Sequence, residues 1–569
     1  MKFRGTAIFL LALAAACAQT PTHEAIHGAV ERPAPRIAQT AHPLATRAAL
    51  EMLDRGGNAI DAIVAAQMVA GLVEPQFSGV GGGSLLLYWD AASRRLVSLD
   101  GLAAAPLRTP ASLRTDVDGK LLPREEVTAG GRPFGVPGTL PVLAMAHRRY
   151  GKLPWRALFE PAIRIAEAGF PMPKFLGQII ELDRIDPRES PTLALYFGAD
   201  GKPLAEGTIV RNPAYAATLR RIAARGVDGM LGDGGAQRIV EAASRGRHPT
   251  LVTAEDLPAY EPLEREPICA PFLAYRVCTT PPPSYGGISL LQVLQMLETR
   301  AEGHFDFSDA RFVHLFLEAG KLARADRSLW VGDPAFTAVP TAGLIASAYA
   351  RSRAATIRAD GTNPDPHAGV PAGVVSFLAP STELAMGGTG QLTVADAAGD
   401  VATMTSTINL GFGARIMVDG FVLNDALTNF AAAPRAGERA ANAMAPRKRP
   451  YTSMAPAIVF DASGRPFAAG GSAGGGPIPD YLVQAWIEML ANGATPAQAV
   501  ARGHFSTFTP GKIVLEKGTA AEALAPSLRA LGHDVVSAPL LSGEGFIERS
   551  GDGWIGAADP RRGGNAAAE

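Results

Sequence analysis

The sequence predicts an α+β fold in which stacked β-sheets are covered by helices. Two observations support this class: long segments of helical periodicity, and a change to short paired strands after residue 388. Helices and strands that follow one another in mixed order, with no internal repeat, favour layers of sheet and helix. The expected helical segments are 46–74, 139–170, 213–245, 287–300, 309–325, 479–492 and 520–531.

The first helical segment contains its own turn. It is rich in Ala, Leu, Met and Val at helical spacing, and Gly56, Gly57 and Asn58 interrupt it. We therefore expect two helices, the second beginning near Asn58, because Asn is a favoured residue at a helix N-terminus.

Four hairpins are expected where two short apolar strands flank a turn that contains Gly, Asp or Ser. The strand pairs are 84–89 with 95–99, 392–395 with 401–407, 457–460 with 466–469, and 546–548 with 554–557.

The composition of the 569-residue chain is that of a globular protein. Hydrophobic residues make up 47% of it, which is enough for a large buried core and excludes wholesale disorder. Lys and Arg total 53 and Asp and Glu total 54, so the formal net charge is -1. Without a basic excess, nucleic acid is not expected as an obligate partner.

The N-terminus has the pattern of an export signal over residues 1–17. Lys2 and Arg4 precede an apolar run over residues 7–16. This run is shorter than the ~20 residues that a membrane-spanning helix needs, and small residues follow it. We therefore expect a periplasmic or secreted protein.

The end of this signal allows two interpretations. The sequence Ala14-Ala15-Ala16-Cys17 is similar to a bacterial lipobox, which makes Cys17 a possible lipidation site and a lipid anchor to the membrane possible. An ordinary cleavable signal peptide is the alternative. The Pro- and Thr-rich residues 18–36 are expected to form a flexible tether.

The two other cysteines, Cys269 and Cys278, lie nine positions apart in what reads as two short strands joined by a turn. A disulfide is plausible in an oxidising compartment, and two buried thiols are the alternative.

Two short motifs admit a chemical interpretation. Residues 23–27 fit the zinc pattern HExxH, but they lie beside the export signal and no third ligand is evident. We therefore interpret this match as a coincidence. Residues 470–474 fit G-x-S-x-G between an expected strand and an expected helix, where Ser472 would be the nucleophile of a serine hydrolase. The alternative is a glycine-rich loop whose backbone N–H groups face a ligand.

The segment from Gly387 to Asp396 carries a stronger chemical signal. Thr389 begins a strand after two glycines. If it became a new N-terminus, its α-amino group, with a pKa near ~8, would accept the proton of its own hydroxyl. The hairpin returns Thr407 and Asn409 beside it, so that Thr407 is expected to hydrogen-bond the hydroxyl of Thr389.

Taken in order, the motifs of this chain resemble those of the γ-glutamyltransferase (glutathione hydrolase) family. No single motif is specific, but the ordered series extends over most of the chain beyond the signal. Its members are 56–62, 79–83, 136–139, 281–287, the Thr389–Thr407–Asn409 spacing with Phe412 and Gly413, 449–456, 471–475 and 558–561.

The resemblance implies an N-terminal-nucleophile hydrolase fold, a four-layer αββα sandwich. It also implies autocatalytic cleavage between Gly388 and Thr389 into a large subunit, 37–388, and a small subunit, 389–569. Thr389 would then attack a γ-glutamyl amide and form an acyl-enzyme, which water or an amine acceptor resolves. The two subunits of one precursor are the implied protein partners, and no cofactor or metal is implied.

The same resemblance assigns roles to seven further residues. The backbone N–H groups of Gly474 and Gly475 would form the oxyanion hole, and Thr407 would support Thr389 during self-cleavage. The remaining positions, which match those that hold the glutamyl carboxylate and amine, are Asn409, Asn429, Thr452 and Ser453.

The chain departs from the family pattern where the substrate's α-carboxylate and α-amino group are held. Leu102 replaces the Arg that pairs with the carboxylate, Asn429 replaces an Asp, and Arg415 is a possible substitute cation. Three hypotheses follow: a γ-glutamyl hydrolase of weak affinity, an acylase for a glutaryl-type or other acyl amide without an α-amino group, and a non-catalytic, unprocessed periplasmic binding protein.

Overall fold

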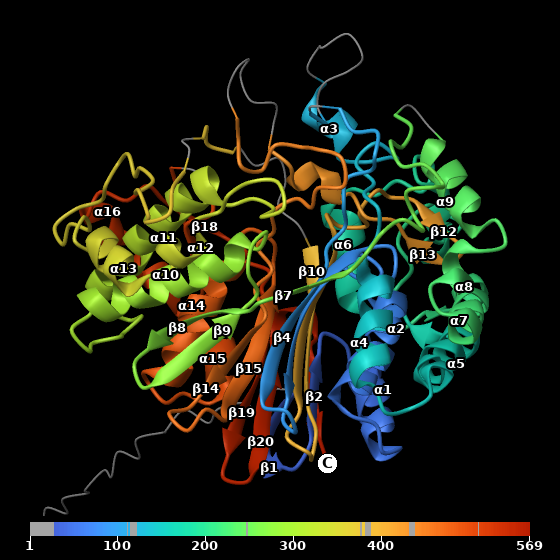
Figure 1. Ribbon diagram of the computed structural model, residues 1–569, viewed down its shortest axis with the longest axis horizontal. Helices are drawn as coiled ribbons and strands as arrows, with labels where there is room; N and C mark the ends of the chain where they lie inside the picture. Colours follow the sequence, from blue (N-terminus) through green and yellow to red (C-terminus); the bar gives the residue numbers. More distant parts are fainter. Residues whose placement is uncertain are drawn as a thin grey trace, which may run out of the picture.

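Two seven-stranded antiparallel sheets lie face to face at the centre of the molecule (Figure 1). The structure is a computed structural model, and it describes residues 28–110, 112–113, 122–245, 248–375, 378–381, 388–431, 439–509 and 511–569. Within these residues, no helix is long and apolar enough to cross a membrane.

The first sheet has the strand order β1-β20-β19-β15-β14-β9-β8. In chain order its strands are β1 (Ala29–Ala34), β8 (Ile268–Phe272), β9 (Tyr275–Thr279), β14 (Ala457–Phe460), β15 (Pro466–Ala473), β19 (Gly543–Ser550) and β20 (Gly553–Ala558).

The second sheet has the strand order β21-β2-β10-β11-β3-β4-β7, so the strand that begins with Gly388 and Thr389 is an inner strand. In chain order its strands are β2 (Ile37–Thr40), β3 (Gly83–Asp90), β4 (Arg95–Gly101), β7 (Leu263–Arg265), β10 (Gly388–Ala395), β11 (Val401–Asn409) and β21 (Asn565–Ala568).

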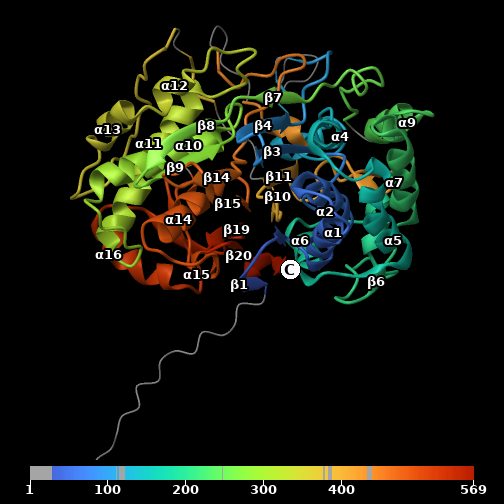
Figure 2. The same ribbon diagram turned by 60° about the horizontal axis from the view of Figure 1, so that its bottom comes forward.

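Helices cover the outer face of each sheet (Figures 1 and 2). The second sheet is covered by α1 (Pro43–Asp54), α2 (Ala59–Val73) and α4 (Thr139–Tyr150), with α5 (Glu160–Ala168), α6 (Lys174–Leu182), α7 (Pro213–Arg225), α8 (Asp228–Leu231) and α9 (Gly235–Ser244) outside them. On the side of the first sheet lie α10 (Tyr285–Arg300), α11 (Ala310–Trp330), α12 (Thr341–Leu344), α13 (Ser347–Ala354), α14 (Ile478–Leu490), α15 (Pro496–Ala501) and α16 (Ala525–Ala530).

Shorter elements complete the described chain. They are α3 (Arg124–Val127), the strand pairs β5 (Phe170–Pro171) with β6 (Ile209–Val210) and β12 (Met417–Val418) with β13 (Phe421–Val422), a three-stranded sheet of β16 (Phe505–Ser506), β17 (Ile513–Glu516) and β18 (Val535–Ala538), and 3₁₀ turns at Trp155–Phe159, Pro191–Tyr196, Ala426–Asn429, Ala520–Leu524 and Pro560–Arg562.

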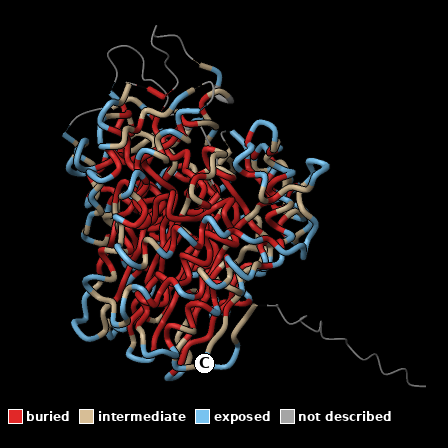
Figure 3. The backbone as a smooth tube through the Cα atoms, turned by 90° about the vertical axis from the view of Figure 1, so that its right-hand side faces the viewer, coloured by how far each residue is buried: buried red, intermediate tan, exposed pale blue. Residues whose placement is uncertain are grey.

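The alternation of side chains along each strand produces the layers. In β3, Leu86 and Tyr88 belong to the core beneath α1, α2 and α4, whereas Leu87 and Trp89 belong to the core between the two sheets. There Trp89 meets Phe460 of the first sheet edge-on, with ring centroids 5.0 Å apart. Both faces of the central strands are covered, so their residues are buried on both sides and buried residues fill the interior (Figure 3). The predicted αββα order is therefore confirmed.

Most of the expected elements are present. The two helices around Gly56 and Gly57 are α1 and α2, and the side chains of Asn58 and Asp61 cap the start of α2 reciprocally. All four hairpins form. The expected helix at 520–531 is instead a 3₁₀ turn followed by α16, which has Pro526 at its start.

The expectation of a tether over residues 18–36 is wrong for its second half. Residues 29–34 form β1, because their backbone pairs with β20 at the edge of the first sheet. The predicted signal, Cys17 and the HExxH match at 23–27 lie outside the described residues.

Cys269 and Cys278 stand directly opposite each other in the hairpin of β8 and β9 and form a disulfide. Their Cα atoms are 4.1 Å apart. Of the two alternatives that the sequence left open, the structure therefore contains the bridge.

Candidate active site

Thr389, at the start of β10, lies opposite a β-bulge in β11. Gly388 pairs with Asn409 and Gly390 pairs with Ser406, so two residues of β11, Thr407 and Ile408, stand opposite the single residue Thr389. A bulge bends its strand and disrupts the ladder locally. Thr389 is only 3% exposed, and its hydroxyl makes no hydrogen bond with any described group.

Gly388 is required by its packing. A Cβ atom at this position would lie 1.9 Å from the Phe77 ring, far inside van der Waals contact. The glycine before the expected cleavage point therefore lets the backbone of β10 approach the aromatic ring closely.

Thr407 contacts the peptide bond between Gly388 and Thr389, where cleavage is expected. Its hydroxyl donates a hydrogen bond to the carbonyl oxygen of Gly388 and accepts one from the backbone N–H of Asn409 at 2.7 Å. We expected a bond to the hydroxyl of Thr389, but in this uncleaved chain the bond is made to the carbonyl of the residue before it, beside the bulge that contains Thr407. The Thr407 hydroxyl instead polarises the carbonyl group that self-cleavage must attack.

Asn409 ends β11 in a left-handed conformation, with φ +81°. Its side-chain amide donates to the hydroxyl of Thr428 at 2.7 Å, which fixes its orientation. Asp425 accepts a hydrogen bond from the N–H of Leu410 at 2.9 Å, and burial raises the pKa of Asp425 to about 7. Sequence reasoning missed Asp425, because the segment 424–430 was considered only for its departures from the family pattern.

Gly474 and Gly475 form the turn between β15 and α14, with φ values of +123° and +69°. A Cβ atom on Gly474 would lie 2.7 Å from the ring of Tyr481. Neither N–H donates a hydrogen bond within the described part of the chain. Both are therefore available as the donors of an oxyanion hole, close to the N-terminus of α14.

Arg562 is a second residue that sequence reasoning missed. It is buried, and its guanidinium donates to the carbonyl oxygen of Thr389 at 2.9 Å and to that of Leu541 at 2.5 Å. The same group stacks 4.7 Å from the centre of the Phe77 ring. It thus binds the backbone of Thr389 from a position near the C-terminus of the chain. Sequence reasoning missed it because the motif that we recognised, 558–561, ends one residue before it.

A cavity of about 420 Å³ borders this centre. Gly388 and Gly474 both line it, as do the charged residues Arg415, Arg562 and Asp183. Its volume is within the usual range for small-molecule sites. Much of the remaining wall is apolar and includes Phe77, Ile179, Leu182, Leu410, Phe508 and Leu540.

The four candidate substrate-binding residues, Asn409, Asn429, Thr452 and Ser453, are not among the residues that line this cavity. Asn429 ends the 3₁₀ turn at Ala426–Asn429. Thr452 forms a bridge with Ser284 at the start of α10, and Ser453 follows it. Arg415, the possible substitute cation, does line the cavity.

Leu102 is packed in a small apolar cluster with Leu85 and Met454, the residue after Ser453. Its Cα lies 3.0 Å from the Cβ position of Gly83, which pairs with Thr407 across β3 and β11. Leu102 is therefore close to the reaction centre, on the side of Ser453, and presents hydrocarbon there.

Ser472 is not a nucleophile elbow. It lies inside β15, paired with Glu544 of β19, and it is only 1% exposed. Its hydroxyl donates to the carbonyl oxygen of Ala473 at 2.7 Å. The expected strand end is wrong because β15 continues through Ala473, so the serine-hydrolase alternative lacks its geometry.

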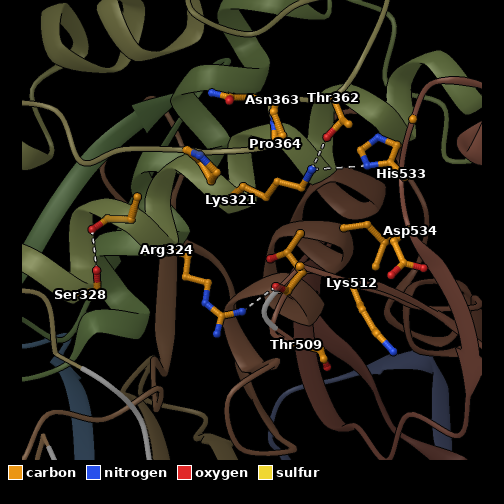
Figure 4. Close-up of a pocket in the computed structure, with 16 residues that line it drawn as sticks. Lys321, Arg324, Ser328, Thr362, Asn363, Pro364, Thr509, Lys512, His533 and Asp534 are labelled. Atoms are coloured by element: carbon orange, nitrogen blue, oxygen red, sulfur yellow. Dashed lines mark hydrogen bonds between the residues drawn. The ribbon is translucent and has the colours of Figure 1, made fainter.

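A second cavity, of about 440 Å³, is lined by none of the predicted site residues (Figure 4). Lys321 in its wall contacts Thr362 and lies 3.5 Å from Nδ1 of His533. Nε2 of His533 is 2.8 Å from Nδ1 of His314. Nε2 of His314 donates to the carbonyl oxygen of Arg358 at 2.7 Å, because a carbonyl oxygen can only accept, so the two rings connect this carbonyl group to Lys321.

Metal-type ligands come together at two places in the described chain: His314, Glu318 and His533, and His504, Glu544 and Asp559. A protein cation already pairs with the carboxylates of each group. Lys321 lies 2.7 Å from Glu318, Arg502 lies 3.3 Å from Glu544, and Arg561 lies 3.1 Å from Asp559. We assign no metal to either group.

The fold and this centre define an N-terminal-nucleophile hydrolase. The family model described as Gamma-glutamyltranspeptidase matches residues 45–569. The chain therefore belongs to the γ-glutamyltranspeptidase family, a family of autoprocessed hydrolases.

Similar proteins within this family are named either as glutathione hydrolases or as acylases. The glutathione hydrolase proenzyme of Bacillus subtilis strain 168 is 32% identical over 538 residues, which cover 93% of this chain and 90% of the relative. The acylase ACY 1 proenzyme of Pseudomonas sp. strain SE83 is 34% identical over 513 residues, with coverages of 89% and 88%. The crystal structure of cephalosporin acylase from Bacillus halodurans superposes with a TM-score of 0.84 at 25% identity, over 98% of this chain and 99% of that one.

Proposed function

We propose that the chain cleaves itself between Gly388 and Thr389, and that Thr389 then hydrolyses an amide through an acyl-enzyme. The observation that carries this proposal is the hydrogen bond from the Thr407 hydroxyl to the carbonyl oxygen of Gly388. It places a donor on the oxygen that becomes negatively charged when the neighbouring Thr389 hydroxyl attacks.

Self-cleavage proceeds through an ester. The Thr389 oxygen attacks the Gly388 carbonyl carbon, the peptide C–N bond breaks, and the nitrogen takes a proton to become the α-amino group of Thr389. Water then hydrolyses the ester, leaves a carboxylate on Gly388 and restores the Thr389 hydroxyl. The new amine, with a pKa near ~8 in water, is the base that the intact chain lacks.

Turnover repeats this chemistry on a substrate. The α-amino group takes the proton of the Thr389 hydroxyl, which attacks the amide carbon. The N–H groups of Gly474 and Gly475 stabilise the oxyanion, and the substrate amine leaves with the proton. Water, or a second amine, then releases the acyl group.

Denaturing mass analysis with N-terminal sequencing tests the cleavage. We expect a fragment that begins Thr-Gly-Gln-Leu and ends at residue 569. Thr389→Ala should remain a single chain without activity, whereas Ser472→Ala should cleave itself and turn over substrate. An intact wild-type chain after long incubation favours the non-catalytic alternative.

For the acyl group, we propose an amide without an α-amino group, such as a glutaryl amide, in preference to a γ-glutamyl amide. Leu102 packs with Leu85 and Met454 beside Ser453 and offers no charge to an α-carboxylate. Asn429, which is neutral, offers no anion to an ammonium group. The α-carboxylate and α-ammonium groups of a γ-glutamyl substrate would therefore be buried here without a cation and an anion to pair with them.

Two matched anilides test this preference. We expect a higher kcat/KM for glutaryl-p-nitroanilide than for γ-glutamyl-p-nitroanilide. Asn429→Asp, alone and with Leu102→Arg, should shift the ratio toward the γ-glutamyl anilide by about tenfold or more, which is the worth of ~1.4 kcal/mol. A wild-type preference for the γ-glutamyl anilide supports the second candidate, a γ-glutamyl hydrolase like the relatives named glutathione hydrolase.

We also propose that the protein is exported to the periplasm or secreted, with Cys17 as a possible lipid attachment site. The disulfide between Cys269 and Cys278 supports this proposal, because such bridges persist in oxidising compartments. Fractionation of expressing cells tests export. If the protein is lipid-anchored, Cys17→Ala should move it from the membrane fraction to the soluble fraction. If it is not anchored, the same substitution should leave its fractionation unchanged.

A further inference from the structure

We propose that the second cavity, of about 440 Å³, binds a phosphate group, carried either by free phosphate or by the monoester of a small molecule. The cavity is lined by residues of α11, of the loop 362–366 and of the small sheet of β16, β17 and β18 with its connections (Figure 4). None of the predicted catalytic or substrate-binding residues lines it, and the inference does not depend on the proposed function.

The side chains that line this cavity carry more positive than negative charge. Lys321, Arg324 and Lys512 are the cations, and Asp534 is the one carboxylate among the described lining residues. Glu318, which does not line the cavity, lies 2.7 Å from Lys321 and balances its charge. With that pair set aside, two lining cations remain against one carboxylate, so the cavity favours an anion.

Lys321 contributes charge to the cavity but no contact to a ligand. Its ammonium group contacts Glu318, the hydroxyl of Thr362 and Nδ1 of His533, so all three of its donors are committed. His533 adds no positive charge at neutral pH, because burial and the charge of Lys321 lower its pKa to about 4.

Lys512 is the cation that a ligand can reach. It directly precedes β17, it is exposed, and its ammonium group forms no hydrogen bond or salt bridge with any described residue. Thr509 and Asn363, which carry a hydroxyl and a carboxamide, line the same cavity (Figure 4). An ammonium group with neutral donors near it suits an anion that has several acceptor oxygens.

Arg324 joins this cavity to the wall of the active-site cavity. Its guanidinium donates to the carbonyl oxygens of Thr507, at 2.8 Å, and of Phe508, and it lies 5.1 Å from the centre of the Phe508 ring. Thr509, the next residue, lines both cavities. The two sites therefore share a segment, and a test of phosphate binding must separate them.

A phosphate group fits these donors better than a carboxylate does. It carries a charge of about −1.5 to −2 at neutral pH and at least three strong acceptor oxygens, whereas a carboxylate carries one charge on two oxygens. The volume of about 440 Å³ leaves room for an organic group beside the phosphate, and the apolar part of the wall includes Ala325, Pro364, Pro366 and Ile513.

Calorimetric titration of the purified protein tests the assignment. The phosphate probes are inorganic phosphate and glycerol 1-phosphate, with glutarate as a dicarboxylate and glycerol as an uncharged counterpart. We expect one site for at least one phosphate probe, with a Kd of about 1 mM or tighter, and binding of glutarate and glycerol that is weaker by about tenfold or more. Tighter binding of glycerol 1-phosphate identifies a monoester as the ligand, and tighter binding of inorganic phosphate identifies the free ion.

Variants assign the binding to this cavity. Lys512→Gln should raise the Kd of the better phosphate probe by about fivefold, and Asp534→Asn should lower it by about twofold, because each removes one exposed charge. Lys517→Gln is the matched control, since Lys517 follows β17 as Lys512 precedes it, is exposed and does not line the cavity. A melting temperature that is unchanged without phosphate confirms that each variant has folded.

Three results overturn the inference. They are the absence of saturable binding by both phosphate probes, binding of glutarate that is as tight as theirs, and a Kd that Lys512→Gln leaves unchanged. Arg415→Gln separates the two cavities: it should keep the wild-type Kd. A Kd raised in Arg415→Gln but not in Lys512→Gln would place the phosphate in the cavity beside Gly388 and would also overturn the inference.

Discussion

At the scale of single residues, Thr407 is the side chain whose role depends most on one contact. It donates to the carbonyl oxygen of Gly388, so Thr407→Val should remove a donor from the oxyanion of self-cleavage. We expect cleavage to slow by about 10²-fold, as for the loss of a comparable donor in other hydrolases. The decay of the intact chain on a denaturing gel measures it.

Thr407→Ser is the matched control, because it keeps the hydroxyl and should cleave at close to the wild-type rate. Cleavage of Thr407→Val at the wild-type rate would show that this contact is only structural.

Asp425 gives a pH-dependent prediction at the same scale. Burial raises its pKa to about 7 in the folded chain, against about 4 when unfolded. As pH rises, the unfolded state releases this proton at a lower pH than the folded state does. The carboxyl therefore lowers the free energy of unfolding progressively between about pH 4 and pH 7, and this destabilisation stays constant above pH 7. Asp425→Asn should therefore gain melting temperature over wild type at pH 8 and less at pH 5.

The gain in the free energy of unfolding at pH 8 should be of the order of 1–4 kcal/mol. Asp552→Asn, at an exposed turn position, is the control and should show no such pH dependence. An Asp425→Asn gain that is equal at both pH values would contradict the assignment of a raised pKa to this carboxyl.

At the scale of elements, the start of β10 depends on close backbone packing. Gly388→Ala would place a methyl group 1.9 Å from the Phe77 ring, whereas Gly390→Ala would meet nothing closer than 3.6 Å, at Ser78. Overpacking of this kind costs about 1–3 kcal/mol. We expect Gly388→Ala to lower the melting temperature and to slow self-cleavage, with Gly390→Ala close to wild type in both.

Equal behaviour of the two variants would show that Phe77 moves away freely. Phe77→Leu combined with Gly388→Ala should recover part of the lost stability, because it removes the ring that causes the clash.

Elements with a strong local pattern were predictable from sequence. The Asn58 cap and the four hairpins carry their own signals of periodicity and turn chemistry. Strand β1 carries none, because residues 29–34 include a proline and show no alternation of apolar and polar side chains, and they are ordered by pairing with β20. The end of β15 was also beyond sequence reasoning, since the glycines that suggest a turn at 470–471 lie inside a strand that needs close packing.

At the scale of the whole molecule, both sheets contain strands from either side of the proposed cleavage point. In the second sheet, β10 lies between β2 and β11, and β11 pairs with β3. Cleavage at Thr389 breaks one bond and none of these ladders. We therefore expect the two fragments to elute together on native size exclusion, at the volume of uncleaved Thr389→Ala, and to separate only in denaturant.

Elution of a free small fragment without denaturant would contradict this sheet topology. The same topology explains why the site joins residues from the whole chain: Arg562, near the C-terminus, binds the backbone of Thr389 and stacks on Phe77.

The sequence by itself determined the class of fold, and it predicted the nucleophile and the bond expected to break. Those features depend on local patterns and on an ordered series of motifs, which can be read without coordinates. Only the tertiary structure decided the bulge of β11 opposite Thr389, the contact from Thr407 to Gly388, the apolar packing of Leu102 and the position of Arg415 in the cavity. These depend on strand register and on packing between segments distant in sequence, which no local pattern specifies.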